Sequence, residues 1–201
     1  MVMVQRRVRG PQRDGAKRRL SARDWADAAL TAIGEGGLAA VAVEPLAARL
    51  GATKGSFYWH FPHRDALIEA ALARWEEIST EAIIAELEGE PDAERRLRRL
   101  FAEATASAAD DTLEVSLLAT ANHPQVAAAL GRVSDRRIGY LARLFTELGF
   151  PPEEARRRGL LAYTSYLGHT QLVHAVPRSL PADAERTRYL ESVIATLLRR
   201  D

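Results

Sequence analysis

The stretch GATKGSFYWHFPHRDAL, residues 51–67, places several hydrogen-bonding side chains next to one another. Five aromatic rings stand in a row at positions 57–61, in a chain in which Phe, Trp and Tyr make up only 6% of the residues. A phenol, an indole N–H and an imidazole can bind phosphate oxygens and the edges of bases in a nucleic-acid groove. A stretch built only for core packing would not need these polar groups, and a purely solvated surface would not carry so many rings.

Helical spacing gives this stretch two faces. Phe57 and Phe61 are four residues apart, so they lie on one face of a helix and can pack into a core. The side chains on the other faces are free to contact a partner, and Gly55 lets a backbone approach closely because it has no side chain. Residues 54–61 therefore predict a helix that two phenylalanines anchor and that presents its other sides to nucleic acid.

Two patterns upstream predict the elements that position this helix. Ser21 is a suitable N-cap for a first helix, which two glycines end at positions 36 and 37. Pro45 fits the first turn of a second helix, which Gly51 ends, and Thr53 can cap the helix that follows. Two helices joined by about three residues that include glycine form a helix-turn-helix.

The charge of the chain is unevenly distributed. The net charge is +1 overall, but residues 1–64 carry +6 and residues 65–201 carry −5. A basic N-terminal part on an acidic body is typical of a nucleic-acid-binding head, and it makes Arg18 and Arg19 candidate DNA contacts. The alternative for the arm of residues 1–19 is a disordered tail that only adds solubility.

The rest of the chain predicts helices and no strands of useful length. Together with the three helices above, the expected fold is all-α with about nine helices, the later ones over residues 63 to the 80s, 92–109, 113–122, 124 to about 149, 152–176 and 182–199. The chain has no cysteine, and residues 159–177 are too polar for a membrane span. These features favour a soluble protein of the cytoplasm that has no membrane partner.

The motif LAARLGATKGSFYWHFPHRDAL, with DAALTAIGEGG before it, resembles the DNA-binding domain of the TetR family of bacterial transcriptional regulators. The resemblance covers about residues 20–75. It implies a helix-turn-helix DNA-binding domain over residues 20–66 and a helical effector-binding and dimerisation domain over residues 67–201. The expected partner is a double-stranded DNA operator, which a twofold dimer would make palindromic. The residues that the resemblance implies at the DNA are Thr53, Lys54, Ser56, Tyr58, Trp59 and His60, with Arg64 in place of the usual phosphate-binding lysine.

The sequence departs from the family pattern just before the second helix. Members usually carry Thr or Ser there, whereas this chain has Val41 and Ala42, followed by Glu44. The change removes a hydroxyl contact and adds an acid near the expected phosphates.

Residues 159–176 contain no Lys, Arg, Asp or Glu, and their apolar side chains occur all round the expected helix. A helix of this kind is buried on all sides. We therefore expect a homodimer through this helix and the last one, residues 182–199.

Large apolar side chains and polar-tipped ones recur on the helices between residues 67 and 176. Such a mixture is typical of ligand cavities, and few charges accompany it, so we expect a neutral, hydrophobic small-molecule effector that releases a repressor from DNA. The candidate contacts are Trp75, Phe101, Thr105, Leu117, His123, Tyr140, Tyr163, Tyr166 and His169.

Two alternatives remain. One is a DNA-binding regulator without a small-molecule ligand, controlled by a protein partner. A remote one is a helical hydrolase or metal enzyme, but His169 and His174 are five residues apart rather than the three or four that suit two ligands on one helical face. We predict no catalytic residue, metal or cofactor. The arginine runs at 95–99 and 156–158 are typical of solvated helix faces.

Overall fold

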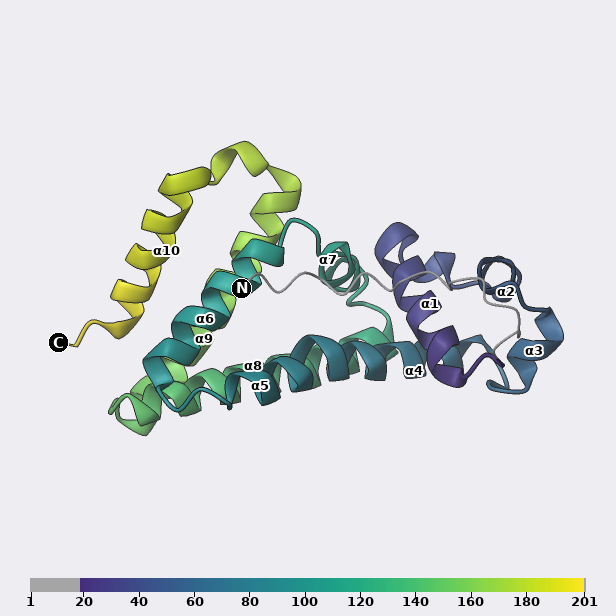
Figure 1. Ribbon diagram of the computed structural model, residues 1–201, viewed down its shortest axis with the longest axis horizontal. Coiled ribbons are helices and arrows are strands. Elements are labelled where there is room, and N and C mark those ends of the chain that lie inside the picture. The colour runs from purple at the N-terminus through teal and green to yellow at the C-terminus, as the bar shows by residue number, and fades with distance from the viewer. Residues whose placement is uncertain (1–18, 201) are drawn as a thin grey trace.

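A computed structural model describes residues 19–200, and all of its regular elements are helical (Figure 1). They are α1 (Ala22–Gly36), a 3-10 turn η1 (Leu38–Ala40), α2 (Val43–Leu50), α3 (Lys54–Tyr58), α4 (Arg64–Glu76), a π-helical turn η2 (Glu77–Glu81), α5 (Ala82–Leu87), α6 (Ala93–Ser107), α7 (Thr112–Ala119), α8 (Pro124–Glu147), α9 (Pro152–Ala175), a 3-10 turn η3 (Pro177–Ser179) and α10 (Asp183–Leu198). Since η2 joins α4 and α5 into one rod, this agrees with the all-α prediction of about nine helices.

The predicted caps explain where the first helix begins and ends. The Ser21 side chain accepts a hydrogen bond from the Asp24 N–H, and the Asp24 carboxylate accepts one from the Ser21 N–H in return. At the other end Gly37 has φ of +70°, a conformation that glycine adopts without strain, and its N–H donates to Ile33 O. The helix therefore spans the predicted residues.

The third helix is shorter than predicted. It ends at Tyr58, and the N–H groups of His60 and Phe61 both donate to Phe57 O in the turn that follows. Pro62 keeps Phe61 out of the helix, because a proline disfavours helical backbone in the residue before it. Trp59 and His60 thus lie in a turn rather than on a helix.

A first hydrophobic core holds the head together and continues past residue 66. Trp25 is at its centre, and both Phe57 and Phe61 pack into it as predicted. Leu67 and Trp75 of α4 belong to the same core, and so do residues of α7 and the first half of α8. The head, residues 19–66, and the body that follows it are therefore joined by continuous packing, with α7 lying between α1 and the body (Figure 1).

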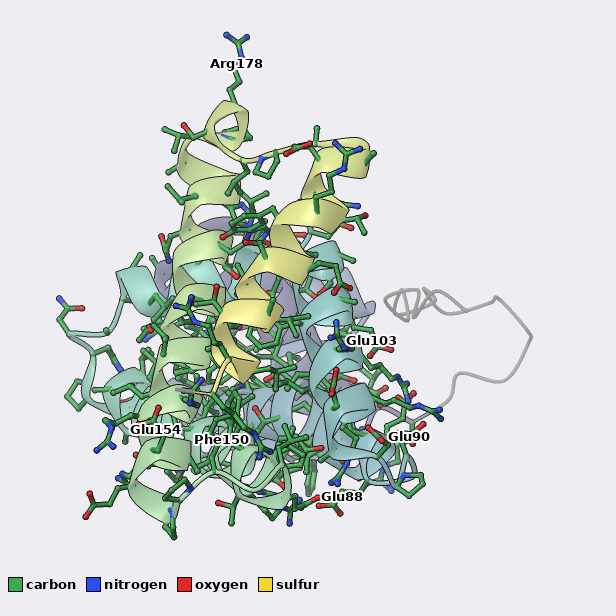
Figure 2. All side chains as sticks on the ribbon, turned by 90° about the vertical axis from the view of Figure 1, so that its left-hand side faces the viewer. Glu88, Glu90, Glu103, Phe150, Glu154 and Arg178 are labelled. Atoms are coloured by element: carbon green, nitrogen blue, oxygen red, sulfur yellow. The ribbon has the colours of Figure 1, made fainter. Side chains whose placement is uncertain are left out.

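A second hydrophobic core fills the body, between α5, α6, α8, α9 and the end of α10. Helices α8 and α9 approach closely at Gly159 of α9, where a Cβ atom would lie 2.9 Å from the backbone nitrogen of Ala142 in α8. Phe150 closes one end of this core between α8 and α9, and the Arg158 guanidinium lies 4.3 Å from its ring centroid (Figure 2).

Ion pairs join the α4–α5 rod to α8 along their length. Arg132 bonds Glu76, Arg136 bonds Glu81, and Arg143 bonds Glu88. Because residue numbers rise together on both sides, the rod and α8 run parallel. The rod that leaves the head is therefore fixed to the body on both sides of the π-helical turn.

The interpretation of residues 95–99 as a solvated face is wrong for Arg96. Its side chain is only 8% exposed and pairs with Glu147 of α8. Its neighbours also cross-link helices, since Arg98 bonds Glu191 of α10 and Arg99 bonds Glu86 of α5.

Within residues 19–200, no helix combines the length and the apolar character needed to cross a membrane.

Candidate nucleic-acid interface and buried polar cluster

The turn between α2 and α3 has the geometry of a helix-turn-helix. Gly51 ends α2 in the left-handed conformation, with φ of +63°, and the Ala52 N–H donates to Ala47 O at 2.8 Å. Thr53 begins α3, because its hydroxyl accepts a hydrogen bond from the Ser56 N–H. The Thr53 side chain thus has a local structural use as well as an exposed position.

One buried ring fixes α3 against the head. Phe57 has no exposed surface, and its ring lies edge-on to Trp25 with the centroids 5.5 Å apart. The neighbouring rings point outward, since Tyr58 is 55% exposed and Trp59 is 84% exposed, while His60 is half-buried. Large aromatic surfaces so exposed are rare on a soluble domain unless a partner covers them.

The cation of α3 has a carboxylate partner. The Lys54 ammonium bonds the carboxylate of Glu44, which lies in the first turn of α2. This bond raises the pKa of Lys54 and lowers the pKa of Glu44, so both groups are charged at neutral pH. Gly55 and Ser56 lie next to Lys54 on the same short helix, and Gly55 is exposed.

Arg64 is the first residue of α4, and its guanidinium already has partners. Its Nε donates to Val41 O at 2.6 Å, and a terminal nitrogen donates to Leu38 O, so it ties the start of α4 to η1. Contact between Arg64 and a phosphate stays a prediction that must be compatible with these two bonds. Arg19 is exposed next to α1, whereas Arg18 lies outside the described residues.

The candidate effector contacts divide between the two hydrophobic cores. Trp75 and Leu117 belong to the head core, whereas Phe101, Tyr140 and Tyr163 belong to the body core. The other four lie elsewhere. The Thr105 hydroxyl bonds Phe101 O, and the Tyr166 hydroxyl bonds Glu114. The His169 ring stacks on Tyr189, and His123 is the N-cap residue of α8. The structure therefore does not bring all nine together around one point.

A buried polar cluster lies between the two cores. It consists of Arg137, Glu114 and Tyr166, from α8, α7 and α9. The Arg137 guanidinium donates to Glu114 Oε1 at 2.7 Å, and the Tyr166 hydroxyl donates to Glu114 Oε2 at 2.7 Å. Glu114 is only 1% exposed, so its charge depends on these two donors.

The same arginine also holds the π-helical turn of the α4–α5 rod. Its Nε donates to the Thr80 hydroxyl at 3.0 Å, and its second terminal nitrogen donates to Ser79 O at 3.2 Å. The guanidinium lies 5.8 Å from the Trp75 ring centroid. Arg137 is thus bonded both to the rod and, through Glu114, to α7.

The helix α7 in turn contacts the head directly. The Ser116 hydroxyl donates to Ile33 O of α1 at 2.8 Å. Asp111 begins α7 by accepting from the Glu114 N–H, and burial raises the pKa of the Asp111 carboxyl. Two of the elements that connect the body to the head, α4 and α7, therefore meet at the polar cluster.

Several buried polar atoms in the expected effector region find no hydrogen-bond partner among residues 19–200. They include the indole nitrogen of Trp75, Nδ1 of His123 and of His169, and the hydroxyls of Tyr140 and Thr170. Burial lowers the pKa of His169, with the nearby Arg186 as a smaller cause, so its ring favours the neutral form. Groups of this kind can bind a ligand that carries hydrogen-bonding atoms.

Comparison with known proteins decides the family of the head. Residues 26–71, which span α1 to α4, match the family described as bacterial regulatory proteins, tetR family. The N-terminal domain belongs to the TetR family. The head accordingly carries the helix-turn-helix DNA-binding domain of this family of transcriptional regulators. No curated protein matches it in sequence.

Solved structures share the fold over nearly the whole chain. A transcriptional regulator from Rhodococcus sp. Rha1 superposes with a TM-score of 0.69 at 22% identity, covering 89% of this chain and 94% of that one. FadR from Bacillus subtilis, solved with stearoyl-CoA, has a TM-score of 0.62 at 15% identity over 89% and 98%. The fatty acid degradation regulator FadR from Bacillus halodurans has a TM-score of 0.63 at 18% identity over 93% and 97%.

Sequence reasoning missed the two charged members of the polar cluster, Glu114 and Arg137. Glu114 is the single charged residue in α7, TLEVSLLA, and that isolation was the available signal for burial. Arg137 gave no such signal for burial, because it stands beside Arg136 in a charged segment of α8. Only the fold shows that Arg137 points inward and Arg136 outward.

Proposed function

We propose that this TetR-family chain is a cytoplasmic homodimer that binds a palindromic DNA operator and represses transcription until a small hydrophobic effector releases it. The observation that carries the proposal is the outward surface of α3 and its turn. Phe57 anchors this surface in the core, and Tyr58, Trp59 and Lys54 lie exposed on it. An anchored helix with exposed aromatic and cationic groups suits the major groove.

The support for a homodimer is an uncharged exposed stripe on α9. It includes Leu160 and Leu161 near the middle of α9 and Leu172 near its C-terminal end, and Val176, the C-cap residue, continues it; all four are more than 40% exposed. Several leucines exposed together on one helix are unusual for a monomer and are typical of an interface. Two copies related by a twofold axis would present their α3 helices to two half-sites.

The support for an effector is the set of unpartnered buried groups beside apolar side chains. Trp75, His169 and Thr170 offer hydrogen-bonding atoms that no described residue uses. FadR from Bacillus subtilis, which shares the fold, was solved with stearoyl-CoA. A ligand that binds better to one arrangement of α4 and α7 would shift the spacing of the two α3 helices.

One observation favours regulation without a small molecule. The candidate effector contacts Trp75, Leu117, Tyr140 and Tyr163 are all at most 5% exposed and are packed within the two cores. A body whose interior is filled by its own side chains can be stable without a bound ligand. A thermal-shift screen with fatty acids, acyl-CoA thioesters and neutral hydrophobic compounds separates the two proposals, since only an effector-binding body is stabilised.

DNA binding is tested by selecting duplexes from a random pool with the full chain. We expect enrichment of a palindrome whose affinity falls steeply with salt. Tyr58→Ala combined with Lys54→Ala should weaken binding at least tenfold, while Arg178→Ala should not. Arg178 is a matched cationic control because it projects from η3, far from α3 (Figures 1 and 2). Unchanged binding by the double variant would remove the role assigned to α3.

A further inference from the structure

An acidic side chain lies within the surface proposed to meet DNA. Glu44 is the second residue of α2, and its carboxylate bonds the ammonium of Lys54, the first residue of α3. Both side chains are more than half exposed, at 64% and 56%. The two helices of the helix-turn-helix are thus joined at their N-terminal ends by an ion pair that faces solvent.

The carboxylate of Glu44 uses groups that a DNA phosphate would use. Besides Lys54, its own backbone N–H in the first turn of α2 lowers the pKa of this carboxylate. The N-cap residue, Ala42, offers no side-chain hydrogen bond to that turn. Anionic oxygens are favoured at a helix N-terminus and next to a lysine, and phosphates bind proteins through both kinds of donor.

The described part of the head has only a small net positive charge. Residues 19–64 carry five Arg and Lys against four Asp and Glu, a net charge of +1. Arg49 pairs with Glu35, and Arg64 is bonded to the carbonyl oxygens of Val41 and Leu38. Removing the charge of Glu44 would raise the net charge of this region to +2 and leave Lys54 without its carboxylate.

We propose that Glu44 is an affinity-determining residue that acts as an internal substitute for a DNA phosphate, so that every duplex must displace it from Lys54 in order to bind. This inference rests on the proposed DNA-binding function. Its consequence is that Glu44 weakens binding to operator and to other duplexes alike, because phosphates are common to all sequences. Recognition of a base by Glu44, such as the amino group of cytosine, is the competing outcome.

The test compares Glu44→Gln with wild type, and Glu35→Gln is the matched control. Glu35 is also an exposed head residue paired with a cation, Arg49, so its substitution removes the same charge and frees a cation. Affinity is measured by fluorescence anisotropy on the duplex selected by the wild-type chain and on a mixed-sequence duplex of equal length, over a series of salt concentrations. Thermal unfolding confirms that each variant is folded.

We expect Glu44→Gln to bind both duplexes about three- to tenfold more tightly, with a log–log salt slope steeper by about one. Glu35→Gln should change affinity less than twofold. In a Lys54→Met background the gain from Glu44→Gln should shrink, because the two residues act as a pair.

Three results would overturn the inference. The first is an unchanged or weaker affinity of Glu44→Gln for both duplexes. The second is a loss of affinity confined to the selected duplex, which indicates base recognition. The third is an equal gain of affinity from Glu35→Gln, which indicates an effect of net charge alone. If the wild-type chain enriches no duplex, the proposed function itself fails. If it does enrich one, failure of the Glu44→Gln gain affects only this inference.

Discussion

Replacing Arg137 by methionine tests whether the buried polar cluster holds the body together. The variant keeps an unbranched side chain of similar length, but it removes the bonds to Glu114, Thr80 and Ser79. Glu114 is 1% exposed and would keep only the hydroxyl of Tyr166 as a donor. A buried carboxylate left without its cation is strongly unfavourable.

The expected loss is large for one substitution. Breaking a buried ion pair by removing one partner costs about 3–5 kcal/mol. For a chain of this size each kcal/mol lowers the melting temperature by about 2–4 °C, so Arg137→Met should melt roughly 6–20 °C below wild type. Adding Glu114→Gln should restore part of the loss, because the remaining buried group is then neutral.

The neighbouring residue supplies the control. Arg136 also pairs with a glutamate, Glu81, but these side chains are 42% and 53% exposed. An exposed pair contributes at most about 1 kcal/mol, so Arg136→Met should melt within a few degrees of wild type. Melting is followed by circular dichroism at equal protein concentrations. Equal melting temperatures for the Arg137 and Arg136 variants would refute the reasoning.

Three further predictions concern packing, pH and assembly. Gly159→Ala should destabilise the chain by about 1–3 kcal/mol in urea unfolding, because its Cβ would lie 2.9 Å from backbone of α8, whereas Gly139→Ala, which has open space, should be neutral or stabilising. The raised pKa of Asp111 means that the folded state holds this proton more tightly than the unfolded state, so its contribution to stability falls as pH rises from below the unfolded pKa through the folded one. Asp111→Asn, which can still cap α7, should therefore be more stable than wild type in urea unfolding at pH 7. This difference in stability should disappear towards pH 3. A difference that grows on acidification would contradict the direction of the pKa shift. Leu161→Glu with Leu172→Glu should convert the proposed dimer to a monomer in light scattering, and an unchanged mass would exclude the α9 stripe as the interface.

The sequence predicted well those elements whose signals are local. Ser21 and Gly37 mark the ends of α1, and Gly51 with Thr53 marks the turn, because capping and left-handed backbone depend on single residue types. The length of α3 was overestimated because the apolar pair at 57 and 61 also suits a turn packed on the core.

Features that depend on distant contacts could not be predicted. The partners of Arg137 are 23 and 57 residues away in the sequence, so no local pattern indicated that it, rather than Arg136, would be buried. The π-helical turn at residues 77–81 has an ordinary helical sequence and lies where Arg137 bonds Ser79 and Thr80. The roles of individual side chains at the DNA and at an effector stay predictions.

The positions of the three tryptophans make the chain its own optical reporter. Trp59 is 84% exposed beside α3, whereas Trp25 and Trp75 are buried, one under α3 and the other next to Arg137. Tryptophan fluorescence at long wavelength, which a soluble quencher removes, will therefore come from Trp59. A bound duplex would shield Trp59 from the quencher. Emission at short wavelength will report the two buried rings. A Trp59→Phe chain would thus follow an event in the interior without any signal from the DNA surface.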